Sequence, residues 1–474
     1  MPALFAFAGT IRQSSYAGLS LSIFLSQYLA VFGALWTQGR PLDFGGWVPQ
    51  FARRYAVGEP LHLEGWFFIA PTRALVANGS TLTLLLGLVY LMLAAWALAA
   101  LAYRRAVDVD ISAWIAAWAI VPIVQFPVIA ALCLLPSRPA PTVVPAIATG
   151  KAAVSVGAAA AQGCLAGAGL TLLAVAMGAL AFGAYGYGMF VASPFLVGAT
   201  TAYFANRRQD IGARATLWLV AGTCALGGIA LIAVALEGIV CILMAAPLGI
   251  GAALVGGLCG RAIASMPRGS PAQTLSGLSL LPVVFALEMI LPPAVDFDTQ
   301  ERIDVNAPPE AVWQAILHMD AIEAPPALLF RLGVAYPVRG EVIGAGLGGE
   351  RRGEFSTGTA IERVTDWVPN RKLAFVVLSD VPAMQELSPY AHVHSPHVLG
   401  YFRTLYTSFE LEPAPDGNAT RIIERTSHEI RLDPVLYWLT MARWVVHQNN
   451  ARVLDHVRRQ AERTTPPDRR RPSN

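Results

Sequence analysis

Apolar and polar positions divide the chain into two parts with different periodicities. Long apolar runs lie before about residue 295, together with one shorter run at 186–205 that contains Pro194. Beyond about residue 295, alternating positions and turn residues replace these long apolar segments. Because about 20 apolar residues cross a bilayer, the pattern predicts seven or eight membrane-spanning helices. The seven longer runs lie near 16–36, 80–103, 111–135, 161–183, 214–235, 238–260 and 275–293.

The pattern after residue 295 predicts a domain of mixed α and β structure. Alternation over 299–306 predicts a strand, and Pro308, Pro309 and Glu310 are typical of the helix start that follows. Apolar residues at i, i+4 and i+7 predict a long closing helix over 434–463. A short helix is expected at 326–332, further strands near 337–343, 350–357, 358–367, 373–378, 401–412 and 420–432, and a turn at Pro415-Asp416-Gly417-Asn418.

Charge confirms the division and shows what the first part is. Residues 1–295 carry 8 acidic and 14 basic side chains, whereas residues 296–474 carry 23 and 20. A soluble domain of nearly 300 residues with so few charges would lack the polar side chains to cover its surface. The overall hydrophobic fraction of 55% and mean hydropathy of +0.51 agree. We therefore predict a multi-pass membrane domain over 1–295, which excludes a wholly soluble enzyme.

The remaining composition indicates few partners besides the bilayer. A net charge of +3 is small for 474 residues and gives no reason to expect nucleic acid. All five cysteines fall in apolar runs without metal or disulfide spacing, and no dinucleotide or phosphate-loop fingerprint is present. We expect no cofactor. The oligomeric state is left open.

A pattern over residues 4–136 is formed by residues 4–16, by Arg105 and Asp108, and by Ala113-Trp114 and Val121-Pro122. It resembles a family of small bacterial inner-membrane proteins of unknown function. This resemblance implies the bacterial cytoplasmic membrane. The side on which the C-terminal domain lies depends on whether seven or eight spans are present, so it stays undecided.

The second part opens with the motif Ile303-Asp-Val305-Asn-Ala307-Pro308-Pro309-Glu310. This motif resembles the start of the SRPBCC or START-like superfamily, which includes polyketide cyclase/dehydrase and lipid-transport domains. It implies a helix-grip domain over 296–463, in which a curved antiparallel sheet surrounds the long C-terminal helix beside an apolar ligand cavity. Residues 464–474 are expected to form a disordered tail.

The resemblance also implies where a ligand would lie: between the sheet and the closing helix, near the insertion at 379–400. On the strand at 420–432, Glu424 and His428 share a face with Ile422, where they are candidates for polarising a ligand or moving a proton. The alternative is a polar outer face with two isolated isoleucines. Candidate pocket residues are Phe375, His394, His397, Tyr401, Ile422 and Trp438.

Three further groups of residues each allow a structural and a functional interpretation. His392, His394 and His397 are candidate zinc ligands, although Pro396 and the lack of a nearby cysteine favour a loop at the pocket mouth or an exposed polar loop. Arg351 and Arg352, between Glu350 and Glu354, are interpreted as a solvated strand pair, with an acidic ligand group as the alternative. Glu288, inside an apolar run, predicts either a proton or ion path or a hydrogen bond between helices.

Three functions follow as hypotheses. The first is a membrane-anchored protein whose C-terminal domain binds a hydrophobic or lipid-like small molecule. The second is an enzyme of cyclase, dehydratase or hydrolase type that uses Glu424 and His428. The third is a transporter or scaffold in which the C-terminal domain senses a ligand.

Overall fold

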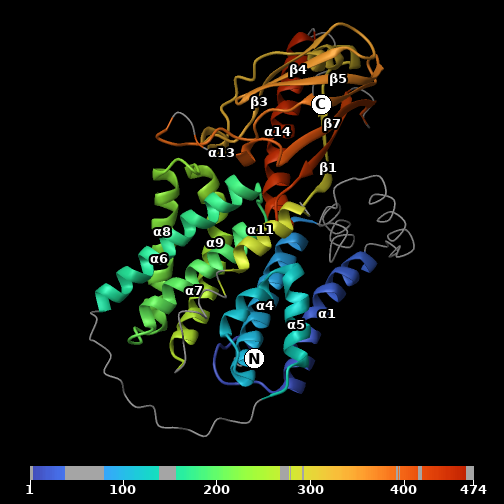
Figure 1. Ribbon diagram of the computed structural model, residues 1–474. Helices are drawn as coiled ribbons and strands as arrows, with labels where there is room; N and C mark the ends of the chain where they lie inside the picture. Colours follow the sequence, from blue (N-terminus) through green and yellow to red (C-terminus); the bar gives the residue numbers. More distant parts are fainter. Residues whose placement is uncertain are drawn as a thin grey trace, which may run out of the picture. The chain divides into compact units, whose positions relative to one another are not determined.

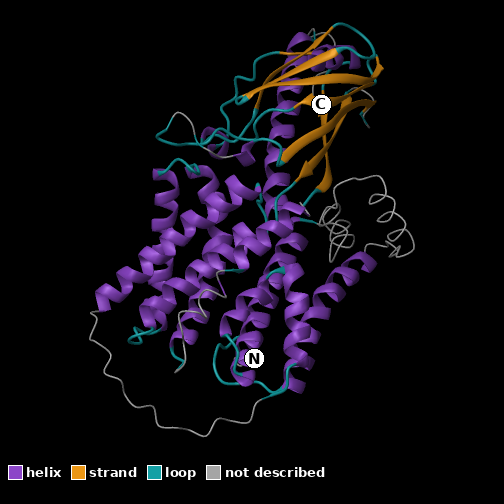
Figure 2. Ribbon diagram, viewed as in Figure 1, coloured by secondary structure: helices purple, strands orange, loops and turns teal. Residues whose placement is uncertain are grey.

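The computed structural model describes residues 4–37, 80–137, 156–266, 277, 279–290, 293–390, 393, 396–414 and 419–465. The chain forms two compact units, Met1–Pro293 with Ser388–Ser395, and Ala294–Leu387 with Pro396–Asn474. The first unit is helical, and the second combines a sheet with a long helix (Figures 1 and 2). His392, His394, the expected turn at 415–418 and most of the expected tail lie outside the described residues.

Helices make up the regular structure described in the first unit. Two π-helical segments, Met177–Phe182 and Gly188–Ala192, extend α6 and precede α7. The α-helices are α1 (Gln13–Thr37), α4 (Thr81–Val109), α5 (Pro122–Leu134), α6 (Val156–Ala176), α7 (Ser193–Asn206), α8 (Ala213–Ala233), α9 (Ile239–Ala264) and α11 (Leu280–Ile290), with a 3-10 helix at Ala113–Ile120.

Five helical stretches in the described residues are long and apolar enough to cross a membrane, so the expected seven or eight spans are not confirmed. The run expected at 111–135 is divided at Val121, and α5 has 13 residues. At 1.5 Å per residue, α5 is about 20 Å long, less than the roughly 30 Å of a bilayer core. The expected spans at 16–36 and 275–293 are likewise not among the five. The five are Thr81–Val109, Val156–Phe182, Gly188–Asn206, Ala213–Ala233 and Ile239–Ala264.

Glycine allows the central helix α7 to touch its neighbour α9 backbone to backbone. A Cβ atom added to Gly198 would lie 1.9 Å from the carbonyl oxygen of Ala253. Gly256, on α9, has the same relation to the carbonyl oxygen of Phe195. Such close contact through small residues is a main source of helix association in membranes, where apolar burial contributes little.

The second unit contains one antiparallel sheet in the order β1-β8-β7-β6-β5-β4-β3-β2. The strand and helix patterns of the sequence predicted these elements closely, apart from the two-residue β2, which is too short to show a pattern. Together with the long C-terminal helix α14 (Val435–Thr464), the curled sheet fits a helix-grip domain (Figure 2). The other elements are β1 (Val295–Val305), α12 (Pro309–Leu317), β2 (His318–Met319), α13 (Leu328–Arg331), β3 (Pro337–Ile343), β4 (Glu350–Phe355), β5 (Gly358–Val368), β6 (Lys372–Ser379), β7 (Phe402–Pro413) and β8 (Thr420–Ile430).

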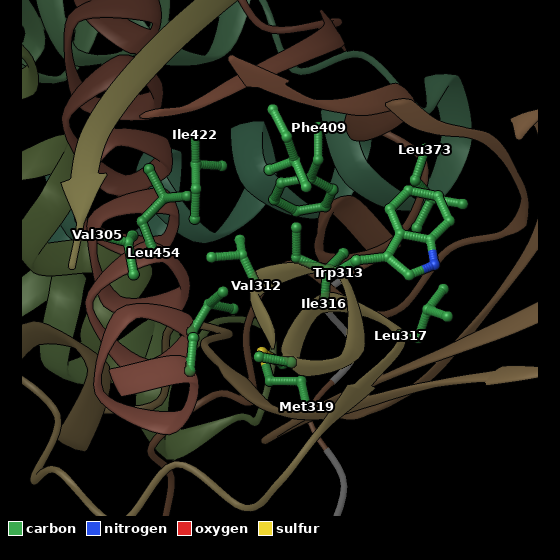
Figure 3. Packing of buried hydrophobic residues seen from close by; sticks show 14 of the residues in the cluster. Val305, Val312, Trp313, Ile316, Leu317, Met319, Leu373, Phe409, Ile422 and Leu454 are labelled. Atoms are coloured by element: carbon green, nitrogen blue, oxygen red, sulfur yellow. The ribbon is translucent and has the colours of Figure 1, made fainter. Parts of the chain in front are cut away.

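An apolar core joins α12, α14 and the inner face of the sheet (Figure 3). Trp313 of α12 lies edge-on to Trp367 of β5, with ring centroids 5.2 Å apart. The part of α14 that joins this core is its C-terminal half, through Leu454, Val457 and Ala461. Next to the turns of α14 that come before Leu454, buried polar side chains such as Thr426 line the inner face of the sheet.

Candidate functional site

The face of β8 that carries Glu424 and His428 is turned into the domain. Burial alternates along the strand, and Glu424, Thr426 and His428 are all buried on the same side as Ile422. Asn450 of α14 reaches Thr426, so this side faces the long helix. The interpretation of this face as a polar outer surface is therefore wrong.

We call the polar side chains gathered here the interior polar cluster. They are contributed by four strands of the sheet and by α14. Except for Thr299, which is half-buried, all are buried despite being polar or charged. The cluster consists of Thr299 (β1), Arg351 (β4), Glu362 (β5), Glu424, Thr426 and His428 (β8), and Asn450 (α14).

Thr426 is the centre of a hydrogen-bond network within this cluster. Its Oγ1 lies 2.6 Å from Thr299 Oγ1 and 2.8 Å from His428 Nε2, and it accepts a bond from Asn450 Nδ2 at 3.3 Å. Thr426 has a single hydroxyl proton, which it donates either to Thr299 or to His428. The orientation of this hydroxyl therefore decides whether His428 carries its proton on Nδ1 or on Nε2.

His428 is held as a neutral ring between two phenylalanines. Its ring stacks on Phe297 at 5.2 Å and on Phe402 at 5.3 Å between centroids. Burial lowers the pKa of His428 to about 3, so the imidazole stays uncharged at neutral pH. Its Nδ1 atom is buried and has no hydrogen-bond partner in the part of the chain that the structure describes.

Glu424 is a buried carboxyl group whose charge is poorly compensated. Burial is the largest cause that raises its pKa to about 8; the positive charge of Arg351 opposes this shift and the negative charge of Glu301 adds to it. The Oε2 atom of Glu424 is buried and makes no hydrogen bond with any described residue. At neutral pH the carboxyl group on its own is therefore largely protonated.

Arg351 is engaged by its neighbours in the sheet. It stands opposite Glu362 in the pairing of β4 with β5, and the two form a buried ion pair. Its guanidinium group also lies 4.3 Å above the centre of the Phe375 ring. Burial raises the pKa of Glu362, and Arg351 opposes that rise.

The interpretation of Arg351 and Arg352 as one solvated pair is therefore wrong for Arg351. Arg352 is exposed and binds Glu350, as expected. The alternation of strand faces was the available signal, because two neighbouring residues in a strand point to opposite sides. Thr299 and Asn450 were missed as well, since nothing local in the sequence marks them.

The spacing of Glu424 and His428 limits what the pair can do. Four residues along a strand separate their Cα atoms by about 13 Å, and Thr426 lies between them. A general acid and a general base that act on one atom must both come within about 3 Å of it. The arrangement is thus better suited to holding separate parts of a bound molecule.

The other predicted pocket residues fall into different surroundings. Phe375 lies under Arg351, at the edge of the polar cluster, and both Phe375 and Ile422 also belong to the apolar core. Trp438 is buried near the start of α14 and lies edge-on to Tyr437 at 5.1 Å. Tyr401 is half-buried before β7, where burial raises the pKa of its hydroxyl group. Ile422 shares the inward face of β8 with Glu424 and His428, and Phe375 is linked to Glu424 through Arg351.

Of the three candidate zinc ligands, the structure describes His397. His397 lies in a short 3-10 helix, Pro396–Val398, and its Nε2 atom is 3.8 Å from Glu386 Oε1. That distance is too long for a hydrogen bond. Since His392 and His394 are outside the described residues, zinc binding by this group stays a prediction.

Glu288, on α11, lies against the segment that connects α6 to α7. Its Oε1 atom accepts a hydrogen bond from the backbone N–H of Gly188 at 2.8 Å. A Cβ atom on Gly186 would lie 2.6 Å from the same oxygen, so the carboxylate occupies a space that only glycine leaves. This is a hydrogen bond between helical segments, and the ion or proton path remains a hypothesis.

Arg105 and Asp108, two of the residues on which the N-terminal resemblance rests, lie on α4, and Arg105 joins this helix to α5. Arg105 is fully buried and forms an ion pair with Asp108. Its Nε atom donates to the carbonyl oxygen of Leu132 at 3.1 Å, near the end of α5. A cation is favourable at the C-terminal end of a helix, where backbone carbonyl groups lack partners.

Comparisons with known proteins give likenesses of low identity. No family model matches the chain, and no curated protein does. A crystal structure of a protein from Mesorhizobium loti is 14% identical, covers 36% of this chain and 99% of its own, and has a TM-score of 0.22. Truncated norcoclaurine synthase from Thalictrum flavum is 11% identical, covers 35% of this chain and 92% of its own, and has a TM-score of 0.23. The Aha1 dimer from Colwellia psychrerythraea is 20% identical, covers 32% of this chain and 94% of its own, and has a TM-score of 0.19. Because these TM-scores are low, the helix-grip assignment rests on the strand order and on α14.

Proposed function

We propose that the C-terminal unit binds a small amphipathic molecule in its interior, while the helical unit anchors it to a membrane. One observation carries this proposal: Glu424 and His428 are buried, and each has a polar atom without a partner among the described residues. An unsatisfied buried polar group costs about 1–3 kcal/mol, so such groups are normally paired. A bound molecule would supply the missing partner.

The surroundings of these two residues fit a molecule with an apolar body. Phe297, Phe375 and Phe402 flank the polar cluster. On β8 the apolar core begins at Ile422, two residues before Glu424. Small-molecule sites are commonly apolar with a few polar groups that fix the orientation of the ligand. A hydrophobic or lipid-like ligand with one polar end fits this description.

Membrane anchoring is supported by the five apolar helices. The proposed location is the bacterial cytoplasmic membrane, which the resemblance of residues 4–136 implies. Such a location would keep the binding domain beside the bilayer, where amphipathic molecules concentrate. The side of the membrane is left to a reporter fused after Arg463.

The test uses the full chain, purified in mild detergent and transferred to lipid nanodiscs. Native mass spectrometry is expected to detect a small molecule that is retained by the wild-type protein. Glu424→Gln should lose it, and Glu412→Gln, at an exposed position on β7, should keep it. If wild-type protein retains no small molecule and takes none up from a cell extract, binding is not its function.

A second function is favoured by the two opposite pKa shifts. The neutral imidazole of His428 and the raised pKa of Glu424 give a base and a protonated acid at neutral pH, a pattern seen in acid–base enzymes. A substrate that spans both groups would allow cyclase, dehydratase or hydrolase chemistry. In that case His428→Phe should keep the bound molecule and abolish its conversion, as followed by mass spectrometry.

A further inference from the structure

The charged groups around Glu424 are mostly negative. In the pairing of β1 with β8, Glu301 stands directly opposite Glu424, and Glu362 contributes a third carboxyl group from β5. The basic groups that the described contacts join to these carboxyl groups are Arg351 from β4 and His447 from α14. This set therefore contains three carboxyl groups and one permanently charged basic group, Arg351.

The basic groups are already engaged. Arg351 is paired with Glu362 and lies over the ring of Phe375. His447 Nδ1 is paired with Glu301 Oε1. Among the described residues, this leaves Glu424 as the carboxyl group of the site whose Oε2 has no partner. The missing partner is thus a hydrogen-bond donor, and a positively charged one would also balance the charge.

We infer that the ligand bound in this interior presents a protonated amine to Glu424, with its apolar body along the phenylalanines of the sheet. This inference rests on the proposed function and names the ligand class. A charged hydrogen bond to a buried carboxylate is roughly twice as strong as a neutral one. A carboxylate or phosphate head would instead meet Glu424 and Glu301, and Arg351 is already paired with Glu362.

Binding of an amine requires the ionised form of Glu424, which changes the pH dependence. Its carboxyl group is largely protonated at neutral pH when nothing is bound, so the bound amine would release one proton to the solvent. Affinity should rise from pH 6 to pH 8 and then level off. The charged groups that act on Glu424 are Arg351 and Glu301. Glu362 is paired with Arg351 and His447 with Glu301, and His428 stays neutral over this range.

The experiment compares three probes with the same apolar body: naphthylethylamine, naphthylethanol and naphthylacetate. Binding to the full chain in phosphatidylcholine nanodiscs is measured by calorimetry, with empty nanodiscs as the blank. We expect the amine to bind most tightly. Glu424→Gln should weaken the amine at least about tenfold, as loss of a charged hydrogen bond predicts, and leave the alcohol nearly unchanged. Glu412→Gln should behave as wild type.

The outcomes separate this inference from the proposed function. If naphthylacetate or naphthylethanol binds as tightly as the amine, or if Glu424→Gln binds the amine as wild type does, the amine assignment is wrong and the binding function stands. If none of the three binds and no small molecule is retained from the cell, both are wrong. An affinity for the amine that is flat from pH 6 to pH 8 would also contradict the role of Glu424.

Discussion

Arg351 on β4 and Glu362 on β5 face each other in the sheet and form an ion pair that is almost wholly shielded from solvent. Their neighbours along β4, Arg352 and Glu350, form an exposed pair of the same residue types. The sheet thus contains a buried and an exposed version of one interaction. Comparing them tests how the interior polar cluster is held.

We predict that Arg351→Met destabilises the C-terminal unit strongly. It would leave Glu362 buried without its counter-charge, and breaking a buried pair from one side typically costs about 3–5 kcal/mol. Amide hydrogen exchange of peptides from β4 and β5, measured on the full chain, should become faster in this variant. The double variant with Glu362→Gln should recover part of the loss, because no unpaired charge remains.

Arg352→Met is the matched control for that prediction. Exposed ion pairs contribute about 0–1 kcal/mol, so hydrogen exchange in β4 should stay close to wild type. Equal effects of the two arginine variants would show that Arg351 is not held as described.

We predict that Glu424→Gln alters the pH dependence of stability. The pKa of Glu424 is raised from its usual 4.5 to about 8 in the folded chain. Its contribution is therefore fully present below pH 4.5 and is lost as the pH rises toward 8, at about 1.4 kcal/mol per pKa unit as an upper limit. Without bound ligand, the Tm of Glu424→Gln should exceed that of wild type increasingly from pH 5 to pH 8. A constant difference across this range would contradict the buried, unpaired state of the carboxyl group.

The sequence predicted the strand that carries this site but not the side it faces. On β8, Glu424, Thr426 and His428 share a face with Ile422, so polarity favoured the outside and the isoleucines favoured the inside. What decides is the curl of the sheet around α14 and the side chain of Asn450, which is distant in sequence. The helix-grip elements themselves were predictable because each has a local period.

For the membrane spans, prediction from the sequence is limited in a different way. Hydropathy locates apolar segments, yet it does not reveal where a helix breaks. The run at 111–135 contains Pro122 immediately after Val121, and the extended backbone at Val121 divides it into two short helices. The residue before a proline disfavours the helical conformation, so the break has a local cause that the length of the apolar run conceals.

We predict that Gly198→Ala prevents normal packing of the helical unit. The added methyl group would lie 1.9 Å from the carbonyl oxygen of Ala253, so α7 and α9 would have to separate. The yield of monodisperse protein and its Tm in detergent should both fall. Gly222→Ala on α8 is the control, because nothing lies within 4 Å of its Cβ position. Its Tm should equal or exceed that of wild type, since alanine favours helix by up to about 1 kcal/mol.

The last prediction concerns Glu288 and separates its hydrogen bond from its charge. Glu288→Gln keeps a side-chain oxygen that can accept from the N–H of Gly188, whereas Glu288→Leu removes the acceptor. A buried N–H without a partner costs about 1–3 kcal/mol, so the Tm of the leucine variant in detergent should fall and that of the glutamine variant should stay near wild type. If Glu288→Gln lowers the Tm as much as Glu288→Leu, the negative charge is what this position requires, and the hydrogen bond to Gly188 is not its main role.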